Sequence, residues 1–251
     1  MEFLWPKTAY LSVGHNIFGK SRFNFQIGKR GMSIGDSETG SVILSPDFET
    51  EGYAQLSFYS PQIRYTGDVI QVDVNRYLYL HRVDLRPFKC IQLGTIEGTY
   101  INAPFEIRYL NPLMIMHSTT PWIGYDDYNE TAADGKEKYY GESRVCAYLA
   151  FTLDWAITKN VRMFGLFAQN EIQMPGEKDS LRGKMFPDGI GGQLGFEVKI
   201  PVKTEGYWYA GMEGLYTTPW LYIKHDADWS LYRRRYDNLM HTAWPINTWI
   251  G

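Results

Sequence analysis

The stretch "SRVCAYLAFTLDWAI" (Ser143–Ile157) decides the fold class, because its hydrophobic residues repeat with a period of two. Every second side chain from Val145 to Trp155 is apolar, whereas the intervening positions end in Thr152 and Asp154. Successive side chains of a β-strand point to opposite faces of its sheet, whereas those of an α-helix repeat every 3.6 residues or so. The stretch therefore predicts a two-faced β-strand.

The same alternation recurs along most of the chain. The runs are longer than the roughly 5–6 residues of an ordinary globular strand, and they suit the roughly 9–11 residues of a tilted membrane-spanning strand. They predict an all-β, antiparallel fold. The quoted runs are "VIQVDVNRYLYLHR" (69–82), "VRMFGLFAQNEIQM" (161–174), "IGGQLGFEVKIPV" (190–202) and "GYWYAGMEGLYT" (206–217).

The connections between the later runs alternate in length. Two are short, "TKN" (158–160) and "KTEG" (203–206), and the segments before, between and after them are long and rich in charged and aromatic residues. An up-and-down membrane barrel has short turns at one end and long loops at the other. The order predicts an antiparallel up-and-down transmembrane β-barrel, or a large part of one, whose apolar strand faces meet lipid. A soluble β-sandwich, with its apolar faces turned to a core, is the alternative.

Composition narrows the function classes. The net charge is -3, with 25 basic and 28 acidic residues, so a basic surface for nucleic acid is not expected. Aromatic residues make up 16% of the chain, which suits interfaces between apolar and wet surroundings, including membrane belts and sugar-binding surfaces. Nothing divides residues 1–251 into domains, so one barrel domain is predicted.

No motif indicates catalysis, a metal or a cofactor. The five histidines show no paired ligand spacing, and "GIGGQLG" (189–195) departs from the dinucleotide-binding pattern at Leu194. Scattered glutamates cannot be placed at a catalytic distance from sequence alone. Cys90 and Cys146 are far apart and belong to no cysteine framework, so two buried thiols are expected rather than a disulfide.

Four segments in order resemble outer-membrane proteins of the Wzi-type capsule assembly family. They are "FQIGKR" (25–30), "GDSETGSVILSPDF" (35–48), "YLYLHRVDLRPFKCIQLGTIEGTY" (77–100) and "FEIRYLNPLMIMHS" (105–118). The resemblance implies a Gram-negative-type outer-membrane barrel that is not an enzyme and that helps to assemble or attach surface polysaccharide. Its implied partners are that polysaccharide and outer-membrane lipid.

Two departures from the family predict that the barrel is incomplete at both ends. The family's barrel needs a longer chain, and this one has neither a signal peptide at its start nor an aromatic terminal strand at "INTWIG" (246–251). A porin-like outer-membrane channel and a soluble β-sandwich carbohydrate-binding or glycosidase domain remain as alternative functions.

Two groups of residues are candidate sites under this interpretation. Aromatic platforms next to carboxylates suit sugar rings, and the loop "PWIGYDDYNE" (121–130) combines them; its candidates are Trp122, Tyr125, Asp126 and Tyr128. Charges on the polar strand faces are expected to line the lumen and to pair there, which offsets the cost of burial. These lumen charges are Arg76, Arg82, Glu97 and Arg108.

The stretch "RYLYLHRVDLRPF" (Arg76–Phe88) makes the orientation testable. If Leu78 and Leu80 face lipid, His81 faces the lumen and Arg82 lies where the strand leaves the hydrocarbon layer. Arg76 would then lie on the lipid side, in the middle of a long strand. We expect a β-bulge near Asn75 to turn Arg76 inward.

Overall fold

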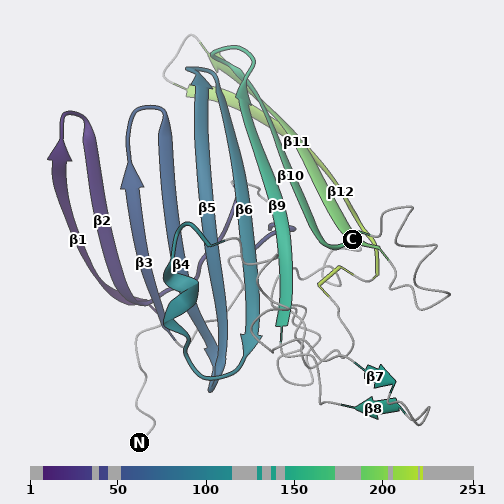
Figure 1. Ribbon diagram of the computed structural model, residues 1–251. Helices are drawn as coiled ribbons and strands as arrows, with labels where there is room; N and C mark the ends of the chain where they lie inside the picture. Colours follow the sequence, from purple (N-terminus) through teal and green to yellow (C-terminus); the bar gives the residue numbers. More distant parts are fainter. Residues whose placement is uncertain are drawn as a thin grey trace, which may run out of the picture.

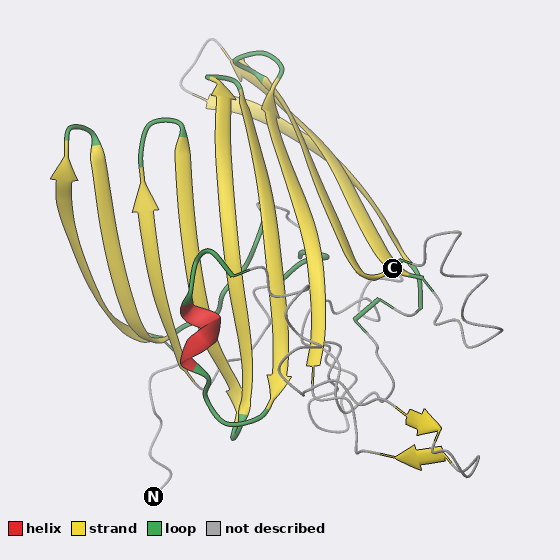
Figure 2. Ribbon diagram, viewed as in Figure 1, coloured by secondary structure: helices red, strands yellow, loops and turns green. Residues whose placement is uncertain are grey.

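The computed structural model describes residues 8–35, 40–44, 52–114, 129–131, 137–139, 145–172, 188–202, 206–219 and 221–222. Ten strands form a single antiparallel sheet in the linear order β1-β2-β3-β4-β5-β6-β9-β10-β11-β12 (Figure 1). Apart from this sheet, the described residues contain one short hairpin and one turn of 3-10 helix (Figure 2). The predicted all-β, antiparallel, up-and-down architecture is confirmed, while the sheet itself is open, with β1 and β12 at its two edges.

Each strand of the sheet pairs with its neighbours along the chain, and β5, β6, β9, β11 and β12 have 12 to 14 residues each. The bounds of the large sheet are β1 Ala9–Phe18, β2 Ser21–Lys29, β3 Gly52–Tyr59, β4 Ile63–Asp73, β5 Arg76–Phe88, β6 Ile91–Asn102, β9 Val145–Ala156, β10 Val161–Glu171, β11 Gly189–Val202 and β12 Gly206–Thr217. The 3-10 helix η1 is Ile107–Leu110, and the separate hairpin is β7 (Asn129–Thr131) with β8 (Glu137–Tyr139).

The short connections gather at one end of the sheet, as the sequence predicts. Residues 19–20, 60–62, 89–90 and 157–160 join strands there, at the upper end in Figure 1, and β11 ends and β12 begins at the same end. We call this the short-turn end. The connections at the opposite end, 30–51, 103–144 and 172–188, are long, and the one exception is the tight turn between β4 and β5.

This tight turn corrects the expectation for "VIQVDVNRYLYLHR". The segment is two strands rather than one, because the chain reverses at Val74 and Asn75, where Asn75 has a φ of 55°. Asparagine tolerates this left-handed conformation better than most residues do. An irregularity in the register does occur, between Gln71 and Asp73. Arg76 is therefore the first residue of β5 and not a mid-strand residue.

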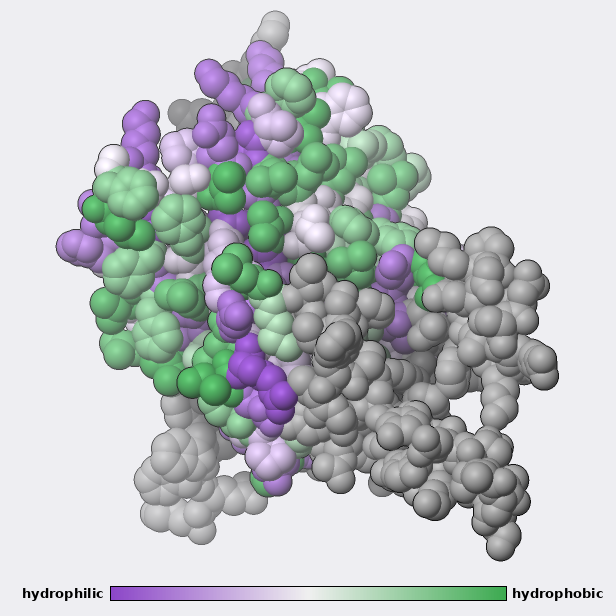
Figure 3. All heavy atoms as spheres, in the orientation of Figure 1, coloured by the Kyte–Doolittle hydropathy of each residue, from purple (hydrophilic) through white to green (hydrophobic). Residues whose placement is uncertain are grey.

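The sheet is curved, and its two faces differ. The convex face, which is turned to the viewer in Figure 1, carries η1. Cross-strand pairing lines up hydrophobic side chains on this face, and many of them are exposed, such as Leu56 at 51% and Trp208 at 72%. Hydrophobic residues accordingly spread over the described strands in Figure 3. Two register rows on this face are Ile63, Leu85, Leu93, Leu153 and Leu194, and Phe23, Phe58, Tyr65, Val83, Phe151 and Phe167.

The concave face is covered by residues 31–35 and 40–44, which we call the inner segment. Val42, Ile43 and Leu44 are at most 1% exposed and belong to the main core cluster. The segment is tied to β11, since the Val42 amide donates to Gln193 Oε1 at 3.4 Å and Gln193 Nε2 donates to the Gly40 carbonyl at 3.2 Å. Part of the concave face is therefore apolar as well.

The inner segment explains why the predicted orientation of β5 is wrong. Leu78 and Leu80 are 0% and 1% exposed in the core cluster with the inner segment, so they point to the concave side. His81 lies on the convex face, where its Nε2 is 3.0 Å from the Tyr109 carbonyl oxygen of η1. Alternation alone cannot say which of two partly apolar faces is turned outward. The same holds for β10, whose concave row is buried: Leu166 and Ala168 belong to this core cluster, and Phe164 is 2% exposed.

Candidate functional site

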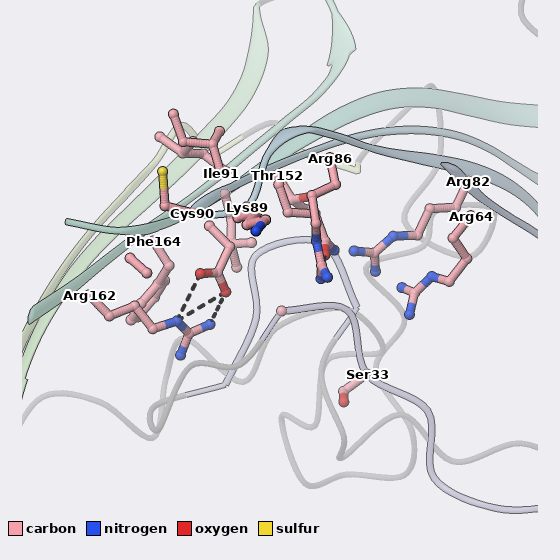
Figure 4. Close-up of a pocket in the computed structure, with 16 residues that line it drawn as sticks. Ser33, Arg64, Arg82, Arg86, Lys89, Cys90, Ile91, Thr152, Arg162 and Phe164 are labelled. Atoms are coloured by element: carbon pink, nitrogen blue, oxygen red, sulfur yellow. Dashed lines mark hydrogen bonds and ion pairs between the residues drawn. The ribbon is translucent and has the colours of Figure 1, made fainter. Parts of the chain in front are cut away.

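A cavity of about 500 Å³ opens on the concave face at the short-turn end. It lies where strands β4, β5, β6, β9 and β10 begin or end, so their terminal residues project into a common space (Figure 4). Its lining is dominated by basic side chains, and we call it the basic pocket. Its polar lining residues are Ser33, Arg64, Arg82, Arg86, Lys89, Cys90, Gln92, Thr152, Asp154 and Arg162.

Asp84 organises one side of the basic pocket. Its side chain is only 4% exposed, and it accepts hydrogen bonds from two arginines that lie on neighbouring strands. Arg64 Nε donates to Oδ2 at 2.9 Å, and Arg82 donates to Oδ1 through Nε at 2.9 Å and Nη2 at 2.8 Å. One carboxylate thus holds two guanidinium groups at the pocket wall. Charge-assisted pairs of this kind are stronger and more directional than neutral hydrogen bonds.

Glycine at position 94 makes room for this pair. A Cβ built there would lie 2.7 Å from Asp84 Oδ1 and closer still to Thr152 Oγ1. Gly94 pairs with both Asp84 and Thr152 across the sheet, so its missing side chain leaves space for the carboxylate between β5 and β9.

Arg162 organises the opposite side of the pocket. It is the second residue of β10 and donates from Nε to both carboxylate oxygens of Asp154, at 3.1 and 3.0 Å (Figure 4). Its Nη1 also reaches Glu197 Oε2 on β11 at 3.4 Å. The guanidinium group therefore links β9, β10 and β11 at the short-turn end.

Two further basic residues have no carboxylate partner within the described part of the chain. Arg86 Nη2 donates to Gln92 Oε1 at 3.0 Å, and Lys89 lies in the turn between β5 and β6. The five basic residues of the lining thus face three carboxylates, those of Asp84, Asp154 and Glu197. Among the described residues, these groups carry an excess of two positive charges at neutral pH.

The inner segment forms the far wall of the pocket. Ser33 and Gly35 line it, and Gly35 has a φ of 102°, a conformation that favours glycine. A Cβ at Gly35 would lie 2.8 Å from a methyl carbon of Leu166, so the backbone is packed directly on β10. The inner segment therefore bounds the pocket on the side of β10. A second cavity of about 390 Å³ continues from Ser33, Arg64 and Arg82 toward β2 and β3.

The four predicted lumen charges do not share one face. Arg82 lies in the basic pocket and pairs with Asp84, and Arg76 is in the same strand row at the other end of β5. Glu97 pairs in register with His81 on the convex face, and Arg108 belongs to η1 on that same side. These last two residues therefore lie on the side of the sheet opposite to Arg82. Glu97 lies in a row of every second residue of β6 that is polar over only part of its length. Arg108 does not lie in a strand.

Arg108 is partly exposed and pairs within its own segment. Its Nε donates to Glu106 Oε2 at 2.7 Å, and its side chain is 41% exposed. The predicted saccharide loop, with Trp122, Tyr125, Asp126 and Tyr128, lies outside the described residues, and its role stays a prediction.

Sequence reasoning missed most of the basic pocket. Arg64, Arg86, Lys89 and Arg162 each lie within three residues of a short turn, and that shared position is the signal that could have found them. In an up-and-down sheet all such turns meet at one end, so basic residues beside separate turns are brought together. The prediction for the two cysteine thiols is confirmed in part. Neither is in a disulfide, but only Cys146 is buried, whereas Cys90 is exposed in the turn beside the pocket.

Other site types find little support in the described part of the chain. Its histidine, cysteine and acidic side chains form no group of three or more that could hold a metal ion. It also contains no helix that is long and apolar enough to cross a bilayer. No protein-family model matches the sequence, and no curated protein or solved structure matches it either.

Proposed function

We propose that the chain is an outer-membrane β-barrel protein, or a large part of one, that resembles the Wzi-type capsule assembly family. In this role it acts without catalysis in the assembly or attachment of surface polysaccharide. The observation that carries the proposal is the contrast between the two faces of the sheet. The convex face is hydrophobic and open, and the concave face holds the buried ion pairs.

The exposed hydrophobic face favours lipid over water. Phe25, Leu56, Phe151 and Leu194 are between 39% and 51% exposed although they lie mid-strand. Contiguous apolar patches beyond a few hundred Å² are rare on soluble monomers. A soluble β-sandwich would cover such a face with a second sheet. Among the described residues the only other sheet is the small β7–β8 hairpin, which is too short to do so.

Strand geometry agrees with a membrane-spanning role. Strands of 12 to 14 residues exceed the roughly 9–11 that a tilted strand needs to cross a bilayer. The division into short turns at one end and long loops at the other is the arrangement of bacterial outer-membrane barrels, in which the short turns face the periplasm. By that rule the basic pocket opens toward the periplasm.

Attachment or assembly is favoured over a porin-like channel because the inner segment occupies part of the concave side. Porins keep a water-filled lumen, whereas Val42 and Ile43 are almost fully buried against the strands here. Planar bilayer recordings separate the two functions. The proposal expects no steady ionic conductance, and ohmic conductance would favour the porin-like channel.

Membrane insertion and polysaccharide retention test the proposal together. The refolded protein is expected to float with lipid vesicles in a density gradient. Cells that lack the gene are expected to lose carbohydrate from the cell-bound fraction to the medium, and the gene in trans should restore it. A protein that stays monomeric in detergent-free buffer, or an unchanged carbohydrate distribution, would contradict the proposal.

A further inference from the structure

We propose that the basic pocket binds an oxyanion group, carboxylate or phosphate, of an acidic saccharide that enters from the short-turn end. The saccharide class rests on the proposed function, whereas the oxyanion chemistry rests on the pocket itself.

The charge balance of the pocket leaves it ready for an anion. Asp84 accepts hydrogen bonds from two arginines, and Arg162 pairs with Asp154 and Glu197. Arg86 and Lys89 complete the lining without a carboxylate partner in the described part of the chain. A cluster of cations with a positive excess is destabilised by self-repulsion, and a bound anion would relieve it.

The geometry suits an oxyanion rather than a neutral sugar. In Figure 4 the side chains of Arg64, Arg82 and Arg86 extend from their strands into the same space. Arg64 donates to Asp84 through Nε, so its two terminal nitrogens are left for a ligand. Guanidinium groups offer paired N–H donors that match the two oxygens of a carboxylate or phosphate. The volume of about 500 Å³ lies within the range of about 300–1,000 Å³ that is typical of small-ligand sites.

The short-turn end gives access to the pocket. Arg64 is 39% exposed at its side chain, and Cys90 in the adjacent turn is exposed, so this end is open. Beside β10, Gly35 packs on Leu166 and bounds the pocket. The second cavity shares Ser33, Arg64 and Arg82 with the pocket and continues toward β2 and β3. A chain end or a side branch of an acidic saccharide can therefore enter from the short-turn end.

The test compares Arg86→Gln with Lys89→Gln, alone and combined, in the full chain in detergent. Lys20→Gln is the matched control, because Lys20 is exposed in the β1–β2 turn at the same end and does not line the pocket. Isothermal titration calorimetry at low salt would use trigalacturonic acid, the neutral maltotriose and inorganic phosphate as separate probes.

We expect trigalacturonic acid to bind the wild type and maltotriose not to bind. The double variant should bind the acid at least about tenfold more weakly, which corresponds to about 1.4 kcal/mol, and Lys20→Gln should match the wild type. Added salt should weaken binding further. If inorganic phosphate binds at least as tightly as the acid, the oxyanion chemistry stands, and the saccharide part of the proposal is overturned.

Equal binding of maltotriose, or full binding by the double variant, would overturn the pocket proposal. This outcome is separate from failure of the proposed function. A chain that does not float with vesicles, yet binds acid through Arg86 and Lys89, would refute the membrane role and leave the oxyanion site intact. A chain that inserts into vesicles but binds no anionic probe would refute the oxyanion site and leave the membrane role intact.

Discussion

Tyr222 donates its hydroxyl to the carbonyl oxygen of Val42 at 2.6 Å, across 180 residues of sequence. Both residues are almost fully buried, and the Tyr222 ring also meets Tyr148 of β9 edge-on at 5.4 Å between ring centroids. The backbone amide of Tyr222 is held by Asn170 Oδ1 at 2.8 Å. The chain after β12 thus locks the inner segment onto the sheet.

Tyr222→Phe is expected to lower the free energy of unfolding by about 1–2 kcal/mol, because it leaves the buried Val42 carbonyl without its partner. Urea unfolding in detergent, followed by tryptophan fluorescence, measures the change. Tyr216→Phe, at a residue 67% exposed, is the control and should unfold like the wild type. Equal stability of the two variants would show that the hydroxyl does not hold the inner segment.

The Tyr222 contribution should also have a defined pH range. Burial raises the pKa of the Tyr222 phenol well above its ordinary value of 10.0. The stabilisation is therefore complete below that ordinary value and declines as the pH rises above it. The gap between the unfolding midpoints of Tyr222→Phe and the wild type should stay constant through neutral and mildly alkaline pH. A gap that closes near neutral pH would contradict the hydrogen bond.

Gly98→Ala is expected to be strongly destabilising, by about 2 kcal/mol or more, because overpacking a buried site forces its neighbours to move. A Cβ at Gly98 would collide with the ring of Tyr148, which is 1% exposed in the core. Gly214→Ala is the matched control, since nothing lies within 4 Å of a Cβ there. Thermal unfolding of the two variants should differ clearly, and equal melting temperatures would count against this packing.

Asp84→Asn should lower stability while strengthening the binding of an anion. The change removes the carboxylate that Arg64 and Arg82 share. Breaking a buried ion pair costs about 3–5 kcal/mol, and the cost is lower here because one of the two arginines is partly exposed. The same change removes one negative charge, so the net charge of the basic pocket rises by one. Trigalacturonic acid titration and urea unfolding should move in opposite directions, and a loss of both would mean that Asp84 only maintains the fold.

Val13→Arg should reduce membrane insertion far more than Ser12→Arg does. Val13 is 51% exposed and pairs with Phe25 on the convex face, whereas Ser12 pairs with Gln26 on the concave face. An arginine on the lipid side of a barrel costs up to about 2–4 kcal/mol near the bilayer centre. Vesicle flotation of the two neighbouring variants measures the difference, and equal flotation would argue that the convex face does not meet lipid.

The alternation of residues predicted strands β9 to β12, although it merged parts of β4 and β5 into one segment, and the connection lengths predicted the up-and-down order of the sheet. Neither could predict which face is concave. Leu78 and Leu80 form as good an apolar row as Phe151 and Trp155 do, yet the first row packs on the inner segment and the second is partly exposed. That difference depends on a contact between residues far apart in sequence, which no local pattern records.

The candidate site was harder to predict than the fold for a related reason. Arg82 was expected among the lumen charges, although it shares a row with Leu78 and Leu80. Its neighbours Arg64 and Arg162 come from other strands, and only the pairing register brings them to the same end of the sheet. A prediction from one strand at a time finds single charges, whereas the pocket is a property of five strands together.

The inner segment has a consequence for the whole cell if the proposed membrane role holds. A barrel whose interior is filled by its own chain does not add to the leak of ions and small solutes across the envelope. Its copy number can then rise with the demand for polysaccharide at the surface without compromising the permeability barrier. An open channel of the same size would face a strict upper limit on abundance.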